Sequence, residues 1–302
     1  MLASVVIRTF NEARYLDELL TEVSNQNTNV VKNEVVIVDS GSTDGTLEIA
    51  QKHNCLITHI KKSDFTFGRS LNIGCEFAKG DFLVFVSGHC IPASPDWLDE
   101  LCKPLVEKKV SYAYGRQLGR DTTKYSESKH FDKWFPEYSK VPQEGFFCNN
   151  ANAAIARPAW NKFGFNEDLT GLEDMYLAKQ IVESGKKIGY VSSAPVYHIH
   201  DESWSQLRTR YEREAYALQK IMPEVHFAFT DFMRFLISGV MADFASAIRE
   251  KVFLKHCIEI ISFRYNHYWG TYKGNHEMRK LSAKQKFHYF YPKDLEKETY
   301  HD

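Results

Sequence analysis

The sequence has few cysteines, almost no net charge and no long apolar run, and each absence excludes a class of protein. The six cysteines among 302 residues are scattered without C-x-x-C spacing, so neither a zinc knuckle nor a disulfide framework is indicated. Lysine and arginine (38) balance aspartate and glutamate (39), so no overall field favours nucleic acid. No segment approaches about 20 uncharged apolar residues, so we expect no membrane-spanning helix.

The Gly-rich phosphate loops of two common nucleotide folds are also missing. No G-x-G-x-x-G follows a predicted strand, and no G-x-x-x-x-G-K-[ST] is present. The first predicted strand begins at Ser4, which leaves no room for a signal peptide, so we expect a cytoplasmic protein with reduced thiols. With 43% hydrophobic and 25% charged residues, the composition is that of a globular chain with a large core.

The stretch from Val35 to Thr46 carries the strongest signal in the chain. Four aliphatic residues predict a strand buried on both faces, and the acidic, hydroxyl-rich turn Asp39-Ser40-Gly41-Ser42-Thr43-Asp44 follows at once. Ligands of open parallel sheets bind at the carboxyl ends of such strands. We therefore expect Asp39 to meet a base or ribose, with Ser42 and Thr43 capping a helix that begins near Thr46. The alternative is that Asp39 and Asp44 only shape a tight turn.

A similar unit lies upstream. Ser4 to Ile7 predicts the first strand, the turn Thr9-Phe10-Asn11-Glu12 follows Arg8, and apolar spacings of three and four predict a helix from Tyr15 to Val23. Together the two units resemble the family 2 glycosyltransferases, whose first strand ends in Thr-x-Asn and whose second ends in Asp-x-Gly-Ser-Thr-Asp. The resemblance implies an α/β fold of the GT-A type, a mixed, mainly parallel sheet with helices on both faces. It also implies that Thr9, Asn11, Glu12 and Ser42 line a nucleotide-sugar donor.

Further residues lie beside the donor if the resemblance holds. Asp64 would be near the base, and the helix carrying Arg69 and Asn72 would approach the diphosphate, because a guanidinium bonds phosphate oxygens in bidentate fashion. A solvated surface arginine is the alternative for Arg69. Asn150 and Asn152 offer donors and acceptors to a donor sugar, although clustered asparagines also form turns.

The acidic metal motif of the family is absent. After the predicted strand Phe82–Val86 the chain reads Ser87-Gly88-His89, where the family usually has an Asp-x-Asp-type motif that holds a divalent metal on the diphosphate. A branch of the family with Ser-x-His is similar, and Ser87 would then face the donor. Mg²⁺ would find few oxygen ligands here, whereas His89 could bind Mn²⁺ or, as a cation, pair with phosphate. A purely structural His89 fits the sequence equally well.

Two more histidines, His198 and His200, end a later predicted strand. Alternate residues of a strand face the same side, so both could join His89 in a site for a borderline metal. The resemblance assigns the metal ligand to His198 in particular. In the alternative, one of the two histidines is buried and the other is solvated.

The acid-base candidate is the pair Glu173-Asp174, which precedes a segment with a helical pattern. Inverting sugar transfer needs one carboxylate to take the proton of the attacking hydroxyl. The resemblance assigns this general base to Asp174 and a supporting role to Glu173. Acidic residues are also favoured at helix N-termini by the macrodipole, which is the structural alternative.

The order of the motifs predicts two parts of the chain. Residues 1–200 would form the GT-A catalytic domain, with further strands at Leu56–Ile60, Tyr112–Gly115 and Gly189–Val191. Residues 201–302 would form a helical extension rich in aromatic and basic residues, with no internal repeat. This extension could contact the inner face of a plasma membrane, form a homodimer, or simply pack on the catalytic domain.

The expected activity is inverting transfer of a sugar from a nucleotide diphosphate donor to a saccharide or lipid-linked acceptor. Such a reaction belongs to the synthesis of bacterial surface polysaccharide, whether capsule, O-antigen or exopolysaccharide. One alternative is a sugar nucleotidyltransferase, which uses a Gly-rich N-terminal loop that this chain lacks. The other is a catalytically inactive sugar-binding or scaffold protein, which the missing acidic metal motif would favour.

Overall fold

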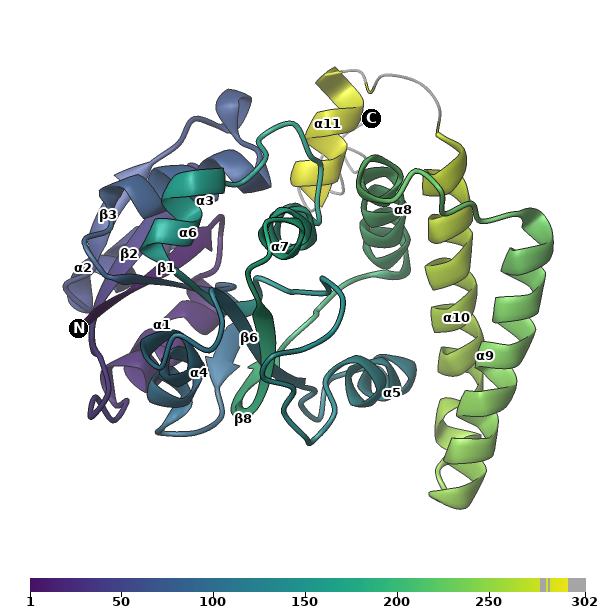
Figure 1. Ribbon diagram of the computed structural model, residues 1–302. Helices are drawn as coiled ribbons and strands as arrows, with labels where there is room; N and C mark the ends of the chain where they lie inside the picture. Colours follow the sequence, from purple (N-terminus) through teal and green to yellow (C-terminus); the bar gives the residue numbers. More distant parts are fainter. Residues whose placement is uncertain (278–280, 282, 293–302) are drawn as a thin grey trace. The chain divides into compact units, whose positions relative to one another are not determined.

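A computed structural model describes residues 1–277, 281 and 283–292, and the chain divides into two compact units (Figure 1). The first unit comprises Met1–Asp121, Phe131–Asp168 and Glu173–Ile199. The second comprises Thr122–His130, Leu169–Leu172 and the chain from His200 onward. Two short segments of the second unit are therefore inserted within the sequence of the first.

The first unit is built on one eight-stranded sheet with the strand order β3-β2-β1-β4-β7-β6-β8-β5. The strands are β1 (Leu2–Thr9), β2 (Lys32–Asp39), β3 (Leu56–His59), β4 (Phe82–Val86), β5 (Cys90–Pro92), β6 (Tyr112–Leu118), β7 (Asn152–Ala156) and β8 (Ile188–His198). Strand β1 pairs in parallel with β2 and β4, β2 with β3, and β6 with β8. Strands β7 and β5 run antiparallel to their neighbours. The predicted mixed, mainly parallel sheet is confirmed.

Helices cover both faces of this sheet (Figure 1). One face packs on α1 (Ala13–Ser24), α2 (Thr46–Lys52) and α4 (Trp97–Val106). The other face packs on α3 (Phe67–Phe77), α6 (Arg157–Phe163) and α7 (Glu173–Glu183), and the short 3₁₀ helix η1 (Lys62–Asp64) precedes α3. Successive residues of a strand serve opposite faces: Val5 and Ile7 pack on the α1 side, and Val6 packs on the α3 side. This is why the central strands are apolar without interruption.

Three details of the fold were predicted wrongly or missed. Ser42 and Thr43 do not cap α2: the residue before this helix is Gly45, with a left-handed φ of 95°, and the Thr46 amide donates to Asp44 instead. The strand predicted at Gly189–Val191 extends to His198, and β7 begins at Asn152, in a segment where no strand was predicted.

The second unit is helical, as expected for the C-terminal part. It contains α8 (Trp204–Ile221), α9 (Phe229–Arg249), α10 (Phe253–His276) and α11 (Ala283–Phe290), and α5 (Tyr125–Trp134) begins in it. Helices α8 and α10 approach closely because α10 has glycine at the contact: a Cβ on Gly274 would lie 2.0 Å from the Glu212 carbonyl oxygen. Helices α9 and α10 lie side by side (Figure 1). Among the described residues, none of the helices combines the length and apolar character needed to cross a membrane.

Candidate active site

The turns that follow β1 and β2 are joined by side-chain hydrogen bonds. Thr9 and Asp39 are partners in the parallel pairing, and the Thr9 hydroxyl donates to Asp39 Oδ1 at 3.0 Å. The backbone amide of Asn11 donates to Ser42 Oγ at 2.9 Å. The amide of Glu12 donates to Thr46 Oγ1, also at 2.9 Å. Five of the predicted donor-site residues therefore meet at the carboxyl ends of two parallel strands.

The carboxylate of Asp39 is hydrogen-bonded within the protein. Its side chain is 1% exposed, and its carboxylate accepts hydrogen bonds from the amides of Gly41 (2.8 Å) and Ser42 (3.0 Å) and from the hydroxyls of Ser42 (2.5 Å) and Thr9. These bonds give Asp39 the turn-shaping role that was the alternative reading. Its contact with a base or ribose stays a prediction.

Asp39→Ala is expected to weaken nucleotide binding, because one charge-assisted hydrogen bond contributes about 1.5–3 kcal/mol. The same change leaves buried donors unpaired, so we also expect the free energy of unfolding to fall by at least about 1–3 kcal/mol. Calorimetry with nucleotide and urea unfolding measure the two effects separately. Asp44→Ala is the matched control, since Asp44 also accepts turn hydrogen bonds but has no predicted base contact. Unchanged nucleotide affinity in folded Asp39→Ala would remove Asp39 from the site.

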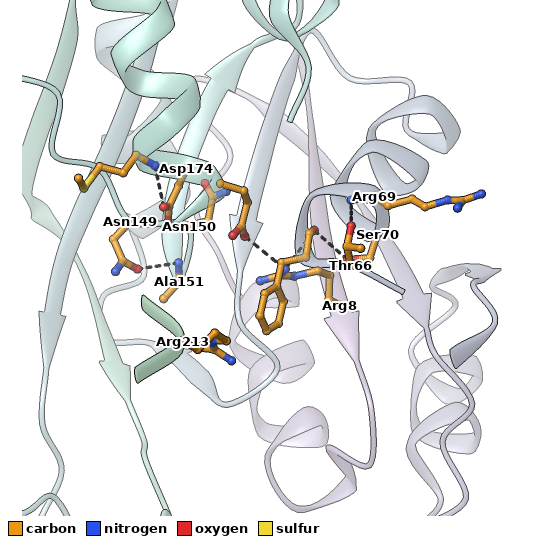
Figure 2. Close-up of polar contacts among 12 residues, drawn as sticks. Arg8, Thr66, Arg69, Ser70, Asn149, Asn150, Ala151, Asp174 and Arg213 are labelled. Atoms are coloured by element: carbon orange, nitrogen blue, oxygen red, sulfur yellow. Dashed lines mark hydrogen bonds and ion pairs between the residues drawn. The ribbon is translucent and has the colours of Figure 1, made fainter. Parts of the chain in front are cut away.

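The segment around α3 places its three candidates differently. Asp64 is exposed on η1 and accepts a hydrogen bond from the Ser63 hydroxyl. Arg69 is exposed, its amide is capped by Thr66, and its side chain points away from Arg8 and Asp174 (Figure 2). Asp64 and Arg69 are thus accessible to a ligand, and their donor contacts stay predictions.

The side-chain amides of Asn72 and Asn152 are used by the fold. Asn72 donates to Phe165 O and Glu167 and accepts from Trp160 Nε1 and the Phe165 amide. Asn152 is 0% exposed, accepts from Trp97 Nε1 at 2.8 Å, and donates to the carbonyls of Arg116 and Ala194. Both N–H groups of each side chain are thus taken. This geometry does not support the predicted contacts of Asn72 with a diphosphate and of Asn152 with a donor sugar.

Asn150 lies against the acid-base candidate. Its backbone amide donates to Asp174 Oδ2 at 2.7 Å (Figure 2), and its side-chain oxygen accepts from the Tyr112 hydroxyl. Asn150 Nδ2 is buried and has no hydrogen-bond partner among the described residues. An unpaired buried donor beside a carboxylate is a group that a ligand or water would satisfy.

Asp174 begins α7 in a buried position. Its two oxygens accept from the amides of Asn150 and Met175, both at 2.7 Å. Burial, followed by the negative charge of Glu173, raises the pKa of Asp174 to about 7. The two amides and Arg8 act in the opposite direction. A carboxyl that titrates near neutrality is suited to general-base chemistry.

Arg8 connects the first strand with the acidic pair. Its Nη1 lies 3.4 Å from Glu173 Oε1 and donates to the Phe67 carbonyl at 3.2 Å (Figure 2). The guanidinium carbon also lies 4.9 Å from the centre of the Phe67 ring. Arg8 therefore contributes a positive charge to the surroundings of Glu173 and Asp174.

His89 and His198 are brought together by the pairing of β5 with β8. Cys90 is the partner of His198 in this pairing, and the two imidazole rings are stacked with centroids 5.3 Å apart. A ring nitrogen of each lies within 4.8 Å of the other. His89 Nδ1 lies 3.3 Å from the Glu12 carboxylate, and Ser87 is half-buried at the end of β4.

A chain of hydrogen bonds fixes the tautomer of His198. The Ala151 amide can only donate, so the Asn149 atom that it meets at 3.0 Å is the oxygen. The same oxygen accepts from Gln117 Nε2 at 3.0 Å, which turns Gln117 Oε1 toward His198 Nδ1 at 2.7 Å. His198 Nδ1 is therefore protonated, and its Nε2 carries the lone pair that a metal would bind.

His200 is the first residue of the second unit. Its Nδ1 lies 2.7 Å from Glu127 Oε1, which also accepts from Arg210 at 2.9 Å. Burial raises the pKa of Glu127, but His200 and Arg210 outweigh burial and lower it to about 2. An ionised Glu127 accepts a hydrogen bond from His200 Nδ1. Whether His200 joins His89 and His198 stays a prediction.

Residues 4–164, more than half of the chain, match the family described as glycosyl transferase family 2. The chain belongs to this family.

Its relatives include two glycosyltransferases of bacterial surface polymers. The chain is 25% identical over 224 residues to O-antigen chain rhamnosyltransferase RfbN of Salmonella typhimurium, covering 70% of each chain. It is 23% identical over 274 residues to the poly(ribitol-phosphate) beta-N-acetylglucosaminyltransferase TarS of Staphylococcus aureus, covering 86% of this chain and 44% of TarS. This chain is thus a family 2 glycosyltransferase that spans less than half the length of TarS.

Solved structures share the fold. The mannosyltransferase PcManGT from Pyrobaculum calidifontis, solved in complex with GDP-Man and Mn²⁺, superposes with a TM-score of 0.59 at 17% identity, covering 96% of this chain and 87% of PcManGT. Residues 1–349 of TarS, in complex with UDP-GlcNAc, give a TM-score of 0.53 at 17% identity, covering 92% of this chain and 93% of that one. The GT-A-type architecture is therefore confirmed.

In this family 2 glycosyltransferase, sequence reasoning missed Arg8, Gln117 and Asn149. Arg8 carried a usable signal, because a charged residue inside an apolar strand needs a buried partner. Gln117 and Asn149 carried none, since their roles depend on pairings between distant parts of the sheet.

Proposed function

We propose that this glycosyltransferase moves a sugar, with inversion, from a nucleotide diphosphate donor to a saccharide or lipid-linked acceptor in surface polysaccharide synthesis. The observation that carries the proposal is buried Asp174, with its pKa raised to about 7, in the unit that holds the Thr9–Asp39 turns. The acceptor class is supported by RfbN and TarS, whose names give an O-antigen chain and poly(ribitol-phosphate). A nucleotide-sugar donor would locate the reaction in the cytoplasm, at the inner face of the plasma membrane.

The proposed chemistry is a single displacement. The acceptor hydroxyl oxygen attacks the anomeric carbon of the donor sugar, and its proton passes to Asp174. The bond between that carbon and the diphosphate oxygen breaks, and its electron pair leaves with the nucleoside diphosphate. Glu173, held by Arg8 at 3.4 Å, supports Asp174 by keeping the neighbouring charge fixed.

The donor side is proposed at the interlocked turns. Asp39, Asn11 and Ser42 would hold the nucleotide, while accessible Asp64 and Arg69 would reach the base and diphosphate. Residues 1–200 would act as the catalytic domain, and residues 201–302 would form its helical extension.

The histidines suit a divalent metal of borderline character. His89 Nδ1 lies 3.3 Å from Glu12, and His198 Nδ1 lies 2.7 Å from Gln117. His200 Nδ1 lies 2.7 Å from Glu127, and oxygen partners of this kind orient imidazoles that bind a metal through the other ring nitrogen. Imidazole nitrogens suit Mn²⁺ better than Mg²⁺, which prefers oxygen ligands. When bound, such a metal would neutralise charge on the leaving diphosphate. We propose that the Ser-x-His motif, Ser87-Gly88-His89, replaces the acidic motif in this way.

A thermal-shift panel distinguishes the proposal from its alternatives. Nucleoside diphosphates and nucleotide sugars are expected to raise the melting temperature by mass action, and Mn²⁺ to increase the shift. Stabilisation by nucleoside triphosphates with sugar phosphates, but not by nucleotide sugars, would indicate a nucleotidyltransferase. Stabilisation by free sugars alone would indicate an inactive sugar-binding protein.

A further inference from the structure

The pair α9–α10 exposes two rows of large apolar side chains. The row on α9 consists of Met233, Ile237, Met241 and Ile248. The row on α10 consists of Leu254, Ile258, Ile261 and Tyr265. Spacings of three, four and seven keep each row on one side of its helix. Leu254 (89% exposed) and Ile258 (76%) are the most exposed members.

Ring contacts between the helices show that both rows lie on the same flank. Phe235 packs on Tyr268 with centroids 6.0 Å apart, and Phe232 packs on Tyr265 at 6.3 Å. At about 100° per residue, Met233 lies on the side of Phe232 that faces away from Phe235. Tyr265 likewise lies on the side of α10 away from Tyr268. The eight residues therefore form one surface, here called the apolar face.

Basic residues surround the end of the apolar face where α9 meets α10. Arg249, Lys251 and Lys255 are exposed, and none of the three forms an ion pair within the described part of the chain. The nearby acidic groups have partners in the second unit: Glu250 binds Lys129, and Glu259 accepts from the Tyr125 amide. The unpaired charge around Leu254 and Ile258 is therefore positive.

We propose that the apolar face binds a bilayer that carries anionic lipid head groups. An exposed apolar surface bordered by lysine and arginine is the pattern of an interfacial membrane contact, in which apolar side chains enter the head-group boundary and cations meet anionic lipid. A second copy docked in parallel through the same face would bring an equally cationic end toward this one, and the two ends would repel. Anionic head groups would instead attract it. The role of this membrane contact rests on the proposed function, since a lipid-linked acceptor would be presented at such a surface.

The test is co-sedimentation of the full chain with vesicles of phosphatidylcholine, alone or mixed with phosphatidylglycerol. The chain is expected to bind the mixed vesicles, and less so at high salt, because screening weakens the contribution of the cations. Leu254→Ser combined with Ile258→Ser is expected to weaken binding by about tenfold or more. Lys251→Glu combined with Lys255→Glu is expected to have a similar effect on the mixed vesicles only.

Matched control variants distinguish binding through the apolar face from non-specific binding to vesicles. Phe77→Ser removes an exposed aromatic residue of the first unit, and Lys186→Glu with Lys187→Glu reverses two exposed charges there. Both controls are expected to bind vesicles like the unmodified chain. Absence of binding to phosphatidylglycerol vesicles, or equal binding by the Leu254/Ile258 variant, would overturn the proposal.

Two further measurements, oligomeric state and transfer activity, distinguish failure of the membrane proposal from failure of the proposed function. If size-exclusion chromatography shows a dimer that the Leu254/Ile258 variant converts to monomer while vesicles are not bound, the apolar face belongs to a second copy. Transfer to a water-soluble acceptor is expected to be the same in the variant and the unmodified chain. If transfer is absent from both while vesicle binding persists, the proposed function is wrong and the membrane surface stands.

Discussion

Asp174→Asn is expected to lower the rate of sugar transfer by about 10²–10⁴-fold, the usual loss when a general base is removed. The amide cannot accept the proton of the acceptor hydroxyl. The donor turns lie at β1 and β2, so donor affinity should change little. Turnover at saturating donor and calorimetry with the donor measure the two quantities.

The hydrogen bonds of Asp174 decide how this variant must be handled. Because both carboxylate oxygens accept from backbone amides, the asparagine must turn its NH₂ group toward one of them. We expect the free energy of unfolding to fall by about 1–3 kcal/mol, so rates must be compared where both proteins are folded. Glu173→Gln is the matched control, with the smaller effect of a supporting residue. If the rate of Asp174→Asn stays within about threefold of that of the unmodified chain, the loss is far smaller than removal of a general base usually causes. That result would direct the search for the base to Glu173.

The raised pKa of Asp174 also predicts a pH dependence. The rate should rise with pH and level off above about 7, since only the ionised carboxylate accepts a proton. Between its ordinary pKa of 3.8 and about 7, the folded state holds a proton that the unfolded state releases. The contribution of the Asp174 carboxyl to the free energy of unfolding is therefore fully present below this pH range and is lost as the pH rises through it. Urea unfolding at several pH values should show this loss in the unmodified chain and not in Asp174→Asn.

The activity of the unmodified chain is expected either to prefer Mn²⁺ to Mg²⁺ or to survive chelation. In both cases His89→Ala is expected to impair turnover. If a metal binds, loss of the His89 imidazole should reduce Mn²⁺ affinity as seen directly by electron paramagnetic resonance. If no metal binds, protonated His89 would pair with phosphate, and nucleotide affinity should fall instead. Strictly Mg²⁺-dependent activity that tolerates His89→Ala would contradict the assignment.

Gln117 provides an independent check on the same site. Gln117→Leu removes the acceptor that fixes the His198 tautomer, and losing such a partner typically reduces metal affinity about 10–100-fold. Gln117→Glu keeps an acceptor for His198 Nδ1 and should retain much of that affinity. Equal Mn²⁺ binding by the leucine variant and the unmodified chain would show that Gln117 only packs.

The sequence predicts those parts of the fold whose signals are local. The aliphatic runs before Thr9 and Asp39, and the run Phe82–Val86, form β1, β2 and β4 because continuous apolar strands need cover on both faces. Strand β7 was not predicted, because three of its five residues are alanine and it follows asparagines. The length of β8 was missed since Ser192-Ser193-Ala194-Pro195 resembles a loop, whereas pairing with β6 and β5 extends the strand to His198.

The candidate site divides in the same way. Thr9, Asn11 and Asp39 could be predicted to meet, because parallel strands bring their carboxyl ends to one edge. Composition could not show that Asn152 bonds Trp97 and two carbonyls. The sequence does not distinguish an asparagine that is hydrogen-bonded within the fold from one that binds a sugar. Nor could it show that Gln117 orients His198 across 81 residues of sequence.

The stereochemistry of the product tests the central claim most directly. The purified chain, supplied with the nucleotide sugar that stabilises it and an acceptor, should release nucleoside diphosphate while forming a glycosidic bond, and proton NMR of the anomeric position can follow both. The account predicts a first-formed product whose anomeric configuration is opposite to that of the donor, made by the unmodified chain and not by Asp174→Asn. A product with retained configuration, or release of pyrophosphate in place of nucleoside diphosphate, would contradict it.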